Sequence, residues 1–379
     1  MSERIAHTTW GRTVLIGVGA ALAIGVVVLA FLWPTVTAKP QNLPIAIAGQ
    51  NSHVPRAQLD AVASALDKAE PGLFDVTTVR DRSAIVAGLE HRDYDGGIVV
   101  GTSPEVLTAG AEGPAIVQVM SAVQGVLQQQ TTARVRQVAE TGAQDAAANG
   151  ASAQQVLQAL ASVPAVNVKL TDVVPLASTD SRGAGISSAV VPLALGGMIG
   201  GVLISILVAG VWRRLAATVI YALAAAAVVV AVLQPWFGIL QGSFLGNYGA
   251  MTLAVFATAS FIVGMSALIG PAGIAVGAVV TILVGVPLSS AAQPPQFLPE
   301  PWGAVGQWLV AGSATTLLRD TSYFTQAPIA FPVLVLAGWS VVGVVLQFAG
   351  HFRSREVVHV EGWDDEDAAP IAGKTPAAV

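Results

Sequence analysis

The sequence contains no cysteine among its 379 residues. This absence excludes disulfide bonds, thiolate metal sites and cysteine-ligated iron–sulfur clusters. The five histidines are scattered along the chain and lack the spacing of metal ligands. We also find no Ser/His/Asp elbow, and no glycine-rich phosphate turn follows the first expected strand. We therefore expect no catalytic residue, no metal site and no cofactor.

Charge is scarce as well. Asp, Glu, Lys and Arg make up 11% of the chain, about half of the share in a soluble globular domain. Residues 34–183 carry 10 Lys/Arg and 14 Asp/Glu, whereas residues 184–350 carry only Arg213, Arg214, Glu300, Arg319 and Asp320. A normally charged domain is thus inserted into a body that suits a bilayer. The net charge of −5 argues against a nucleic-acid partner, because such proteins carry a basic stripe.

Long apolar runs are what the sequence does have. Six of them are long enough to cross a bilayer as helices, since about 20 residues at 1.5 Å each cover the hydrocarbon core. They are residues 14–33, 187–211, 215–233, 249–269, 272–288 and 328–349. The first could instead be a cleaved signal peptide, but its apolar core is longer than the roughly 7–15 residues typical of one. We favour an uncleaved anchor.

Two short breaks separate neighbouring spans. A single helix over 187–233 would be about 70 Å long, more than twice the bilayer core. We therefore expect a tight turn at Trp212, Arg213 and Arg214. Gly270 and Pro271 break the next apolar run, because proline lacks the N–H that would continue the helix.

Basic residues predict the orientation of the chain, because short basic flanks stay in the cytoplasm. An inside N-terminus with six spans puts three pairs of arginines on the same side: Arg4 with Arg12, Arg213 with Arg214, and Arg353 with Arg355. The cytoplasmic parts are then 1–13 and the acidic tail 351–379, which we expect to be disordered. Residues 34–186 and the loops 234–248 and 289–327 lie outside.

The expected external domain alternates strands and helices, which predicts an α/β fold with a parallel sheet. The strands are 45–48, 74–79, 97–100 and 166–174, and the helices are near 55–66, 83–92, 114–140 and 152–163, with a small-residue linker at 142–150. Asp93 and Asp95 have the spacing of a metal pair, but Asp and Gly also make turns. We favour the turn.

Small residues mark the expected contacts between spans. Helix backbones can approach closely in lipid where glycines recur four residues apart. Such glycines are Gly196, Gly197, Gly200 and Gly201 in the second span, with Gly273 and Gly277 in the fifth. We interpret them as sites of packing within one chain rather than as a dedicated dimer face.

The outer loop 289–327 begins with a proline-rich stretch and continues with an expected helix over 303–318. Tryptophan favours the boundary between lipid and water. We interpret Trp302, Trp308, Arg319 and Tyr323 as an interfacial segment that lies at, or dips into, the outer leaflet. A plain packed loop is the alternative.

Short ordered motifs surround the later spans. Residues 180–183 (DSRG) lead into 191–197 (VPLALGG), and 287–290 (PLSS) precede 297–299 (FLP) with Trp302 and Gly303. The last set is Gly306, Gln307, Gly312, 317–319 (LLR), Tyr323 and Phe324. With one span, an external domain and five further spans, the chain resembles the permeases of type-2 ATP-binding-cassette (ABC) exporters, especially the phage infection protein (YhgE/Pip-like) branch.

This resemblance implies a multi-pass permease in a bacterial inner (plasma) membrane. It further implies a homodimer or paired permease, a separate ABC ATPase, and export of a lipid, drug or cell-envelope component. The expected spans contain no ionisable residue, which disfavours coupling to an ion gradient. A cell-envelope scaffold, secretion accessory or phage receptor remains the alternative, because the expected cytoplasmic loops are very short.

Overall fold

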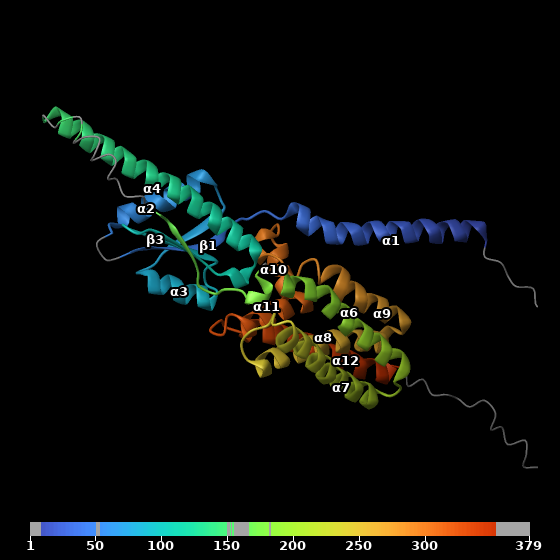
Figure 1. Ribbon diagram of the computed structural model, residues 1–379. Helices are drawn as coiled ribbons and strands as arrows, with labels where there is room; N and C mark the ends of the chain where they lie inside the picture. The colour runs from blue at the N-terminus through green and yellow to red at the C-terminus, as the bar shows by residue number, and fades with distance from the viewer. Residues whose placement is uncertain are drawn as a thin grey trace, which may run out of the picture.

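A computed structural model describes residues 9–50, 54–149, 152, 154, 167–181 and 183–353. An α/β unit lies at one end of a bundle of apolar helices, and the first helix, α1 (Trp10–Thr37), runs apart from that bundle (Figure 1). Arg4, Arg355, most of the expected helix 152–163 and the acidic tail lie outside the described residues.

The α/β unit contains a five-stranded sheet in the order β2-β1-β3-β4-β5. The strands are β1 (Leu43–Gly49), β2 (Phe74–Thr78), β3 (Gly96–Val100), β4 (Glu105–Thr108) and β5 (Lys169–Asp172). β1 pairs in parallel with β2 and β3, as the alternating pattern predicted. The short strand β4 was missed; it pairs antiparallel with β3 and parallel with β5.

Helices cover both faces of this sheet. Because side chains alternate along a strand, Ile45 and Ile47 of β1 face α2 (Arg56–Ala69) and α4 (Pro114–Ala148). Ala46 and Ala48 face α3 (Arg82–His91) on the other side. The N-terminus of α3 is capped by the Asp81 carboxylate, which accepts a hydrogen bond from the Ala84 N–H at 2.9 Å.

Helix α4 is longer than the sequence predicted. It spans 35 residues and continues to Ala148, so the prediction of a linker at 142–150 is wrong for residues 142–148. Alanine-rich sequence favours helix, and one glycine costs only about 1 kcal/mol relative to alanine. Gly142 alone is therefore too weak a break.

Among the described residues, five helices are long and apolar enough to cross a membrane. They are α1, α6 (Ala184–Leu207), α7 (Val211–Ala231, extended to Trp236), α8 (Phe244–Ile269) and α12 (Ala330–Arg353). α8 is the most buried of the five, and α6, α7 and α12 pack around it. The expected span 272–288 appears as the shorter helical stretch Pro271–Val284, made of α9 (Pro271–Ala278) and a π-helical turn.

The turn between α6 and α7 falls earlier than expected. It lies at residues 208–210, where Gly210 has a positive φ of 89°, and Arg213 and Arg214 are inside the first turn of α7. The prediction that both arginines form the turn is therefore wrong. Arg214 donates to the carbonyls of Val208 at 2.7 Å and Ser205 at 3.0 Å, which satisfies carbonyls at the end of α6.

The segment 289–327 is a folded connector between the α/β unit and the helical bundle. Its expected single helix is two helices, α10 (Trp302–Gln307) and α11 (Val310–Ser322). Two glycines permit close backbone contacts of these helices. A Cβ on Gly306 would lie 1.9 Å from the Leu288 oxygen, and one on Gly312 would lie 2.1 Å from the Gly306 oxygen.

Candidate functional site: an apolar pocket and a buried ionic cluster

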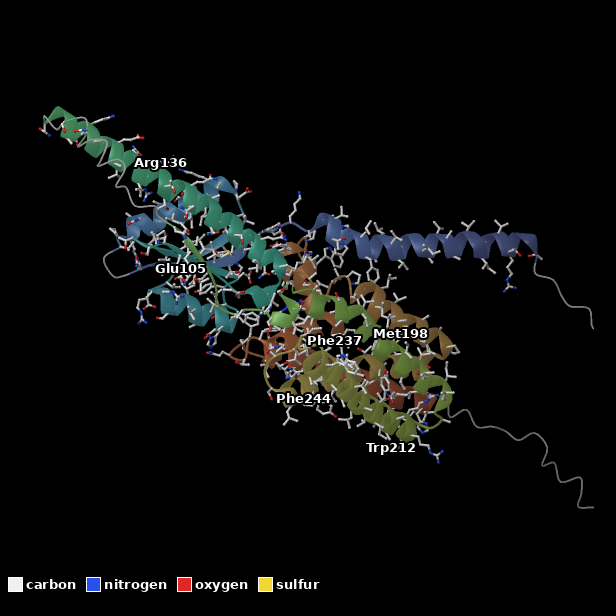
Figure 2. The ribbon with its side chains drawn as sticks, viewed as in Figure 1. Glu105, Arg136, Met198, Trp212, Phe237 and Phe244 are labelled. Carbon is white, nitrogen blue, oxygen red and sulfur yellow. The ribbon has the colours of Figure 1, made fainter. Side chains whose placement is uncertain are left out.

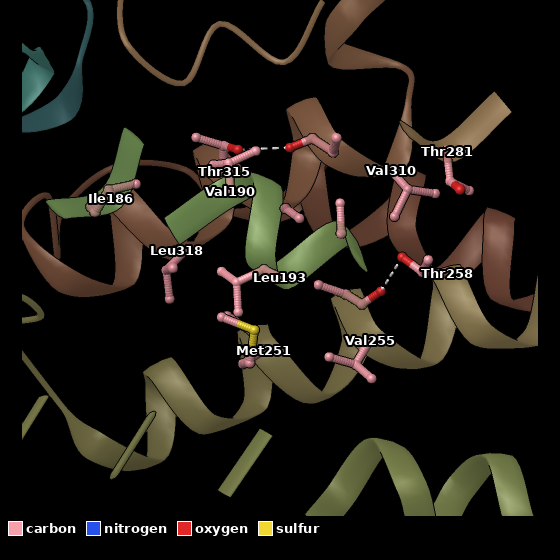
Figure 3. A pocket seen from close by; sticks show the side chains of 15 residues that line it. Ile186, Val190, Leu193, Met251, Val255, Thr258, Thr281, Val310, Thr315 and Leu318 are labelled. Carbon is pink, nitrogen blue, oxygen red and sulfur yellow. Dashed lines mark hydrogen bonds between the residues drawn. The ribbon is translucent and has the colours of Figure 1, made fainter. Parts of the chain in front are cut away.

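The helical bundle contains a narrow pocket with a volume of about 60 Å³ between α6, α8, α11 and the π-helical turn (Figure 3). One enclosed water molecule needs about 10–15 Å³, so the pocket has room for a slender group. The lining residues are Ile186, Val190, Leu193, Ala194, Ala250, Met251, Ala254, Val255, Thr258, Thr281, Val310, Ala311, Ala314, Thr315 and Leu318.

The walls of this pocket are apolar in effect, although three threonines line it. The Thr315 hydroxyl donates to the Ala311 carbonyl at 2.7 Å, and the Thr258 hydroxyl donates to the Ala254 carbonyl at 3.0 Å (Figure 3). The Thr281 hydroxyl donates to the Gly277 carbonyl at 2.8 Å. Each hydroxyl proton is therefore used within its own helix, and the pocket suits an apolar ligand or part of one.

Five of the six glycines singled out in the sequence lie at close contacts between helices. A Cβ on Gly197 would meet Thr258 of α8 at 2.9 Å, and one on Gly201 would meet Ile262 of α8 at 3.0 Å. Gly273 and Gly277 also face α8, whereas Gly200 faces Tyr221 of α7. Gly196 differs, because a Cβ there has open space; its carbonyl accepts a hydrogen bond from the Tyr221 hydroxyl at 2.5 Å.

A buried ionic cluster joins the α/β unit to the connector. Arg92, just after α3, donates to both carboxylate oxygens of Glu112 at 2.6 and 2.9 Å and to Asp320 of α11 at 2.5 Å. The guanidinium also lies 5.2 Å from the centre of the Phe324 ring. Glu112 and Asp320 are almost fully buried, so Arg92 pairs with two carboxylates that cannot reach water.

The sequence did not identify Arg92 or Glu112 as important residues. Glu112 looked like an ordinary charge in the external domain, and its partner comes from a distant segment. One signal was present at the other end of the cluster. Arg319 and Asp320 are two adjacent opposite charges in a region that otherwise carries three, and charges are rarely kept in such a region without a partner.

The four residues of the expected interfacial segment occupy different surroundings. Trp302 is 42% exposed and Trp308 is 62% exposed. Arg319 is only 4% exposed and donates to the Ala291 carbonyl at 2.8 Å. The Tyr323 hydroxyl donates to the Ile239 carbonyl. Arg319 is therefore an interior residue of the connector, and only the two tryptophans have the exposure that a boundary with lipid requires.

Burial and neighbouring charges shift the pKa values of Arg92 and of Asp95 beside the cluster. Desolvation opposes the charge of Arg92, but Glu112 and Asp320 outweigh it and raise the pKa of Arg92. Asp95 lies nearby, and its Oδ2 atom has no hydrogen-bond partner among the described residues. Desolvation and repulsion by Glu112 outweigh attraction by Arg92 and raise the pKa of Asp95 to about 8. Asp95 is thus largely protonated at neutral pH.

Helix α11 takes part in both the apolar pocket and the buried ionic cluster. Its residues Ala311, Ala314 and Leu318 line the apolar pocket, and its Asp320 is held by Arg92 of the α/β unit. Phe324, immediately after the helix, is part of the core under α3. α11 therefore connects the α/β unit to a wall of the pocket.

Arg213 and Arg214, in the first turn of α7, lie at the end of the bundle remote from the α/β unit. Trp212, beside Arg213, is at that end, whereas Glu105 and Arg136 mark the α/β unit (Figure 2). Phe348 near the end of α12 contacts Trp212, with ring centres 5.1 Å apart. α1 reaches the connector through Trp33, which contacts Trp302, and the N-terminal end of α1 lies far from the sheet (Figure 1).

Among the described residues, no group of three or more His, Cys, Asp or Glu side chains could hold a metal ion. The helices define the class of protein: the chain is an α-helical membrane protein of the multi-pass type. No protein-family model, curated protein or solved structure matches the chain.

Proposed function

We propose that this protein is the permease subunit of an ABC-type exporter that moves a lipid or another apolar cell-envelope component out of the cytoplasm. A separate ATPase supplies the energy, and the permease acts as a homodimer or paired half. The observation that carries the proposal is the apolar pocket inside the bundle, in contact with a helix that is clamped to the α/β unit.

The proposal includes a specific topology in a bacterial inner membrane. The α/β unit and the connector lie outside the cytoplasm, and both termini lie inside. Its support is that Arg213 and Arg214 lie at the remote end of the bundle and that Arg12 lies near the start of α1, since basic flanks stay cytoplasmic. The stretch Pro271–Val284 is the sixth span in this proposal; its 14 residues cover about 21 Å as a helix, so residues 285–288 must complete the crossing.

The chemistry of the pocket favours an external energy source. Transport coupled to an ion gradient usually requires a titratable side chain at depth. Among the described residues, no ionisable side chain lines the pocket. If an ion gradient does not supply the energy, ATP hydrolysis is the alternative. This sequence contains no Walker motif, so the ATPase would be a separate chain.

The test uses two neighbouring residues of α6. Ala194 lines the pocket, whereas Leu195 does not and is exposed on the bundle. The full chain, Ala194→Phe and Leu195→Phe are purified from native membranes in mild detergent. Bound chains and bound lipids are identified by mass spectrometry, and ATP hydrolysis is measured.

We expect an ATPase to co-purify with all three forms. The lipid or other apolar molecule bound to the unmodified chain should be lost only in Ala194→Phe. Its stimulation of ATP hydrolysis should be abolished in the same variant. Absence of an ATPase at any stoichiometry would exclude the exporter.

One observation favours the second candidate, a cell-envelope scaffold, secretion accessory or phage receptor. The turns at residues 208–210 and at Gly270 are the described connections at the proposed cytoplasmic end, and both are too short to form a docking surface for an ATPase. In that case the α/β unit should capture an envelope partner while no ATPase is bound.

A further inference from the structure

The remote end of the bundle contains a second cleft, with a volume of about 220 Å³. It lies between the turn at residues 208–210, the end of α8 and the last turns of α12. Arg214, His351 and Gln347 line it together with small residues, among them Ala209, Gly210 and Ala267. This cleft shares no lining residue with the apolar pocket.

Arg214 supplies a fixed positive charge to this cleft. Its Nε and Nη2 atoms donate to the carbonyls of Val208 and Ser205, which orient the guanidinium and leave Nη1 for another acceptor. No described carboxylate lies within salt-bridge distance of Arg214. The charge is therefore positioned without a described counter-ion.

The surroundings of the cleft contain no described acid. Between residues 184 and 353 the acidic residues are Glu300 and Asp320, and both belong to the connector on the side of the α/β unit. The neighbouring Arg213 adds a second, exposed cation. An anion is the ligand that this distribution of charge favours.

Two aromatic residues indicate how deep in the membrane the cleft lies. Trp212 follows the lining residue Val211 and is 71% exposed, and it contacts Phe348 beside Gln347. Exposed tryptophan at the end of a spanning helix is typical of the headgroup level. The cleft thus lies where the phosphate of a lipid would be.

We propose that this cleft binds the phosphate group of an anionic phospholipid in the leaflet opposite to the α/β unit, with Arg214 as the principal contact. Basic pockets between spanning helices recognise anionic headgroups in this way. The proposal does not depend on transport, and it holds equally for a scaffold. Free phosphate offers the same chemistry, so the experiment must separate the two sources.

The full chain is placed in nanodiscs of phosphatidylcholine, with or without phosphatidylglycerol, and a third sample receives inorganic phosphate. Native mass spectrometry counts retained lipids, and the thermal unfolding midpoint is measured in each sample. Arg214→Gln is compared with Arg213→Gln, which removes the same charge one residue away and outside the cleft. Because Arg214→Gln also removes a helix cap, Ala209→Glu and Ala209→Gln form a second pair that leaves Arg214 intact.

We expect phosphatidylglycerol to be retained by the unmodified chain, Arg213→Gln and Ala209→Gln. Its affinity should fall about fivefold or more in Arg214→Gln and Ala209→Glu, from the contribution of one cation near a membrane surface. Equal retention by Arg214→Gln and Arg213→Gln, or by the two Ala209 variants, would overturn the proposal. Stabilisation by inorganic phosphate as strong as that by the lipid would also overturn it, in favour of a soluble anion.

Discussion

At the scale of single residues, the unusual feature of this protein is charge that is kept away from water. Arg92 is 228 residues from Asp320 in the sequence, yet the two side chains are hydrogen bonded. Removing one partner of a buried pair costs much more than the pair contributes, because the remaining charge is left unpaired. The cluster thus makes the position of α11 sensitive to single substitutions.

Replacing Arg92 with glutamine should destabilise the protein by about 3–5 kcal/mol, since Glu112 and Asp320 would lose the cation that is hydrogen bonded to both. The matched control is Arg82→Gln, which removes the exposed pair of Arg82 with Glu105 and should cost at most about 1 kcal/mol. Thermal unfolding of the full chain in detergent measures both. Similar midpoints for the two variants would contradict a structural role for the cluster.

Asp95 makes the stability of the α/β unit depend on pH. Its pKa is raised to about 8 in the folded protein, whereas an unfolded aspartate has a pKa of about 3.9. The folded state therefore binds the extra proton between about pH 4 and pH 8, and the free energy of unfolding should fall as the pH rises through this window.

In Asp95→Asn, which has the same shape and no titratable proton, this fall should be shallower. Unfolding midpoints across the pH series provide the measurement, and parallel curves for the two proteins would refute the assignment to Asp95.

At the scale of elements, the contacts of α8 decide how the bundle packs. α9 approaches it so closely that a Cβ on Gly273 would lie 2.0 Å from the Met265 oxygen. This contact involves backbone, which cannot move aside as a side chain can. The glycine pattern in the sequence indicated close packing, but it could not distinguish the glycines at a contact from Gly196, which faces open space.

Gly273→Ala should therefore destabilise the bundle by about 1–3 kcal/mol, the usual cost of overpacking. Gly196→Ala should be neutral or slightly stabilising, because alanine favours helix over glycine. Resistance to thermal aggregation in detergent reports both effects. Strong destabilisation by Gly196→Ala would instead reveal a contact of Gly196 outside the single chain.

At the scale of the whole molecule, the α/β unit and the bundle are joined through the connector. Phe297 contributes to the core on one face of the sheet, and Phe324 contributes to the core on the other. The backbone N–H of Lys39 also donates to the Phe297 carbonyl at 2.9 Å. The α/β unit is consequently fixed to the connector on both faces of its sheet.

The proposed topology can be tested with single cysteines, because the chain has none of its own. Ser103 is exposed on the α/β unit, and Ala209 is exposed at the remote end of the bundle. In intact cells a membrane-impermeant maleimide should label Ser103→Cys, whereas Ala209→Cys should react only after the membrane is opened. The reverse pattern would invert the topology and with it the proposed direction of export.

The amino-acid sequence by itself determined the membrane class, the positions of five helices that are long and apolar enough to cross a membrane, and the alternation β1-α2-β2-α3-β3. Hydropathy and helical or strand periodicity are local properties, so they can be read without knowing what lies nearby in space. The same local reading missed β4 and mistook residues 142–148 for a linker. A four-residue strand and a single glycine carry too little local signal to decide the outcome.

Only the tertiary structure decided what the connector does. The sequence separated residues 34–186 from the loop 289–327, yet Phe297 and Phe324 of that loop complete the core of the α/β unit. The partners of Arg92 and the walls of the apolar pocket likewise come from segments far apart in the chain. Side-chain burial and ion pairing depend on such long-range contacts, and no local pattern of residues specifies them.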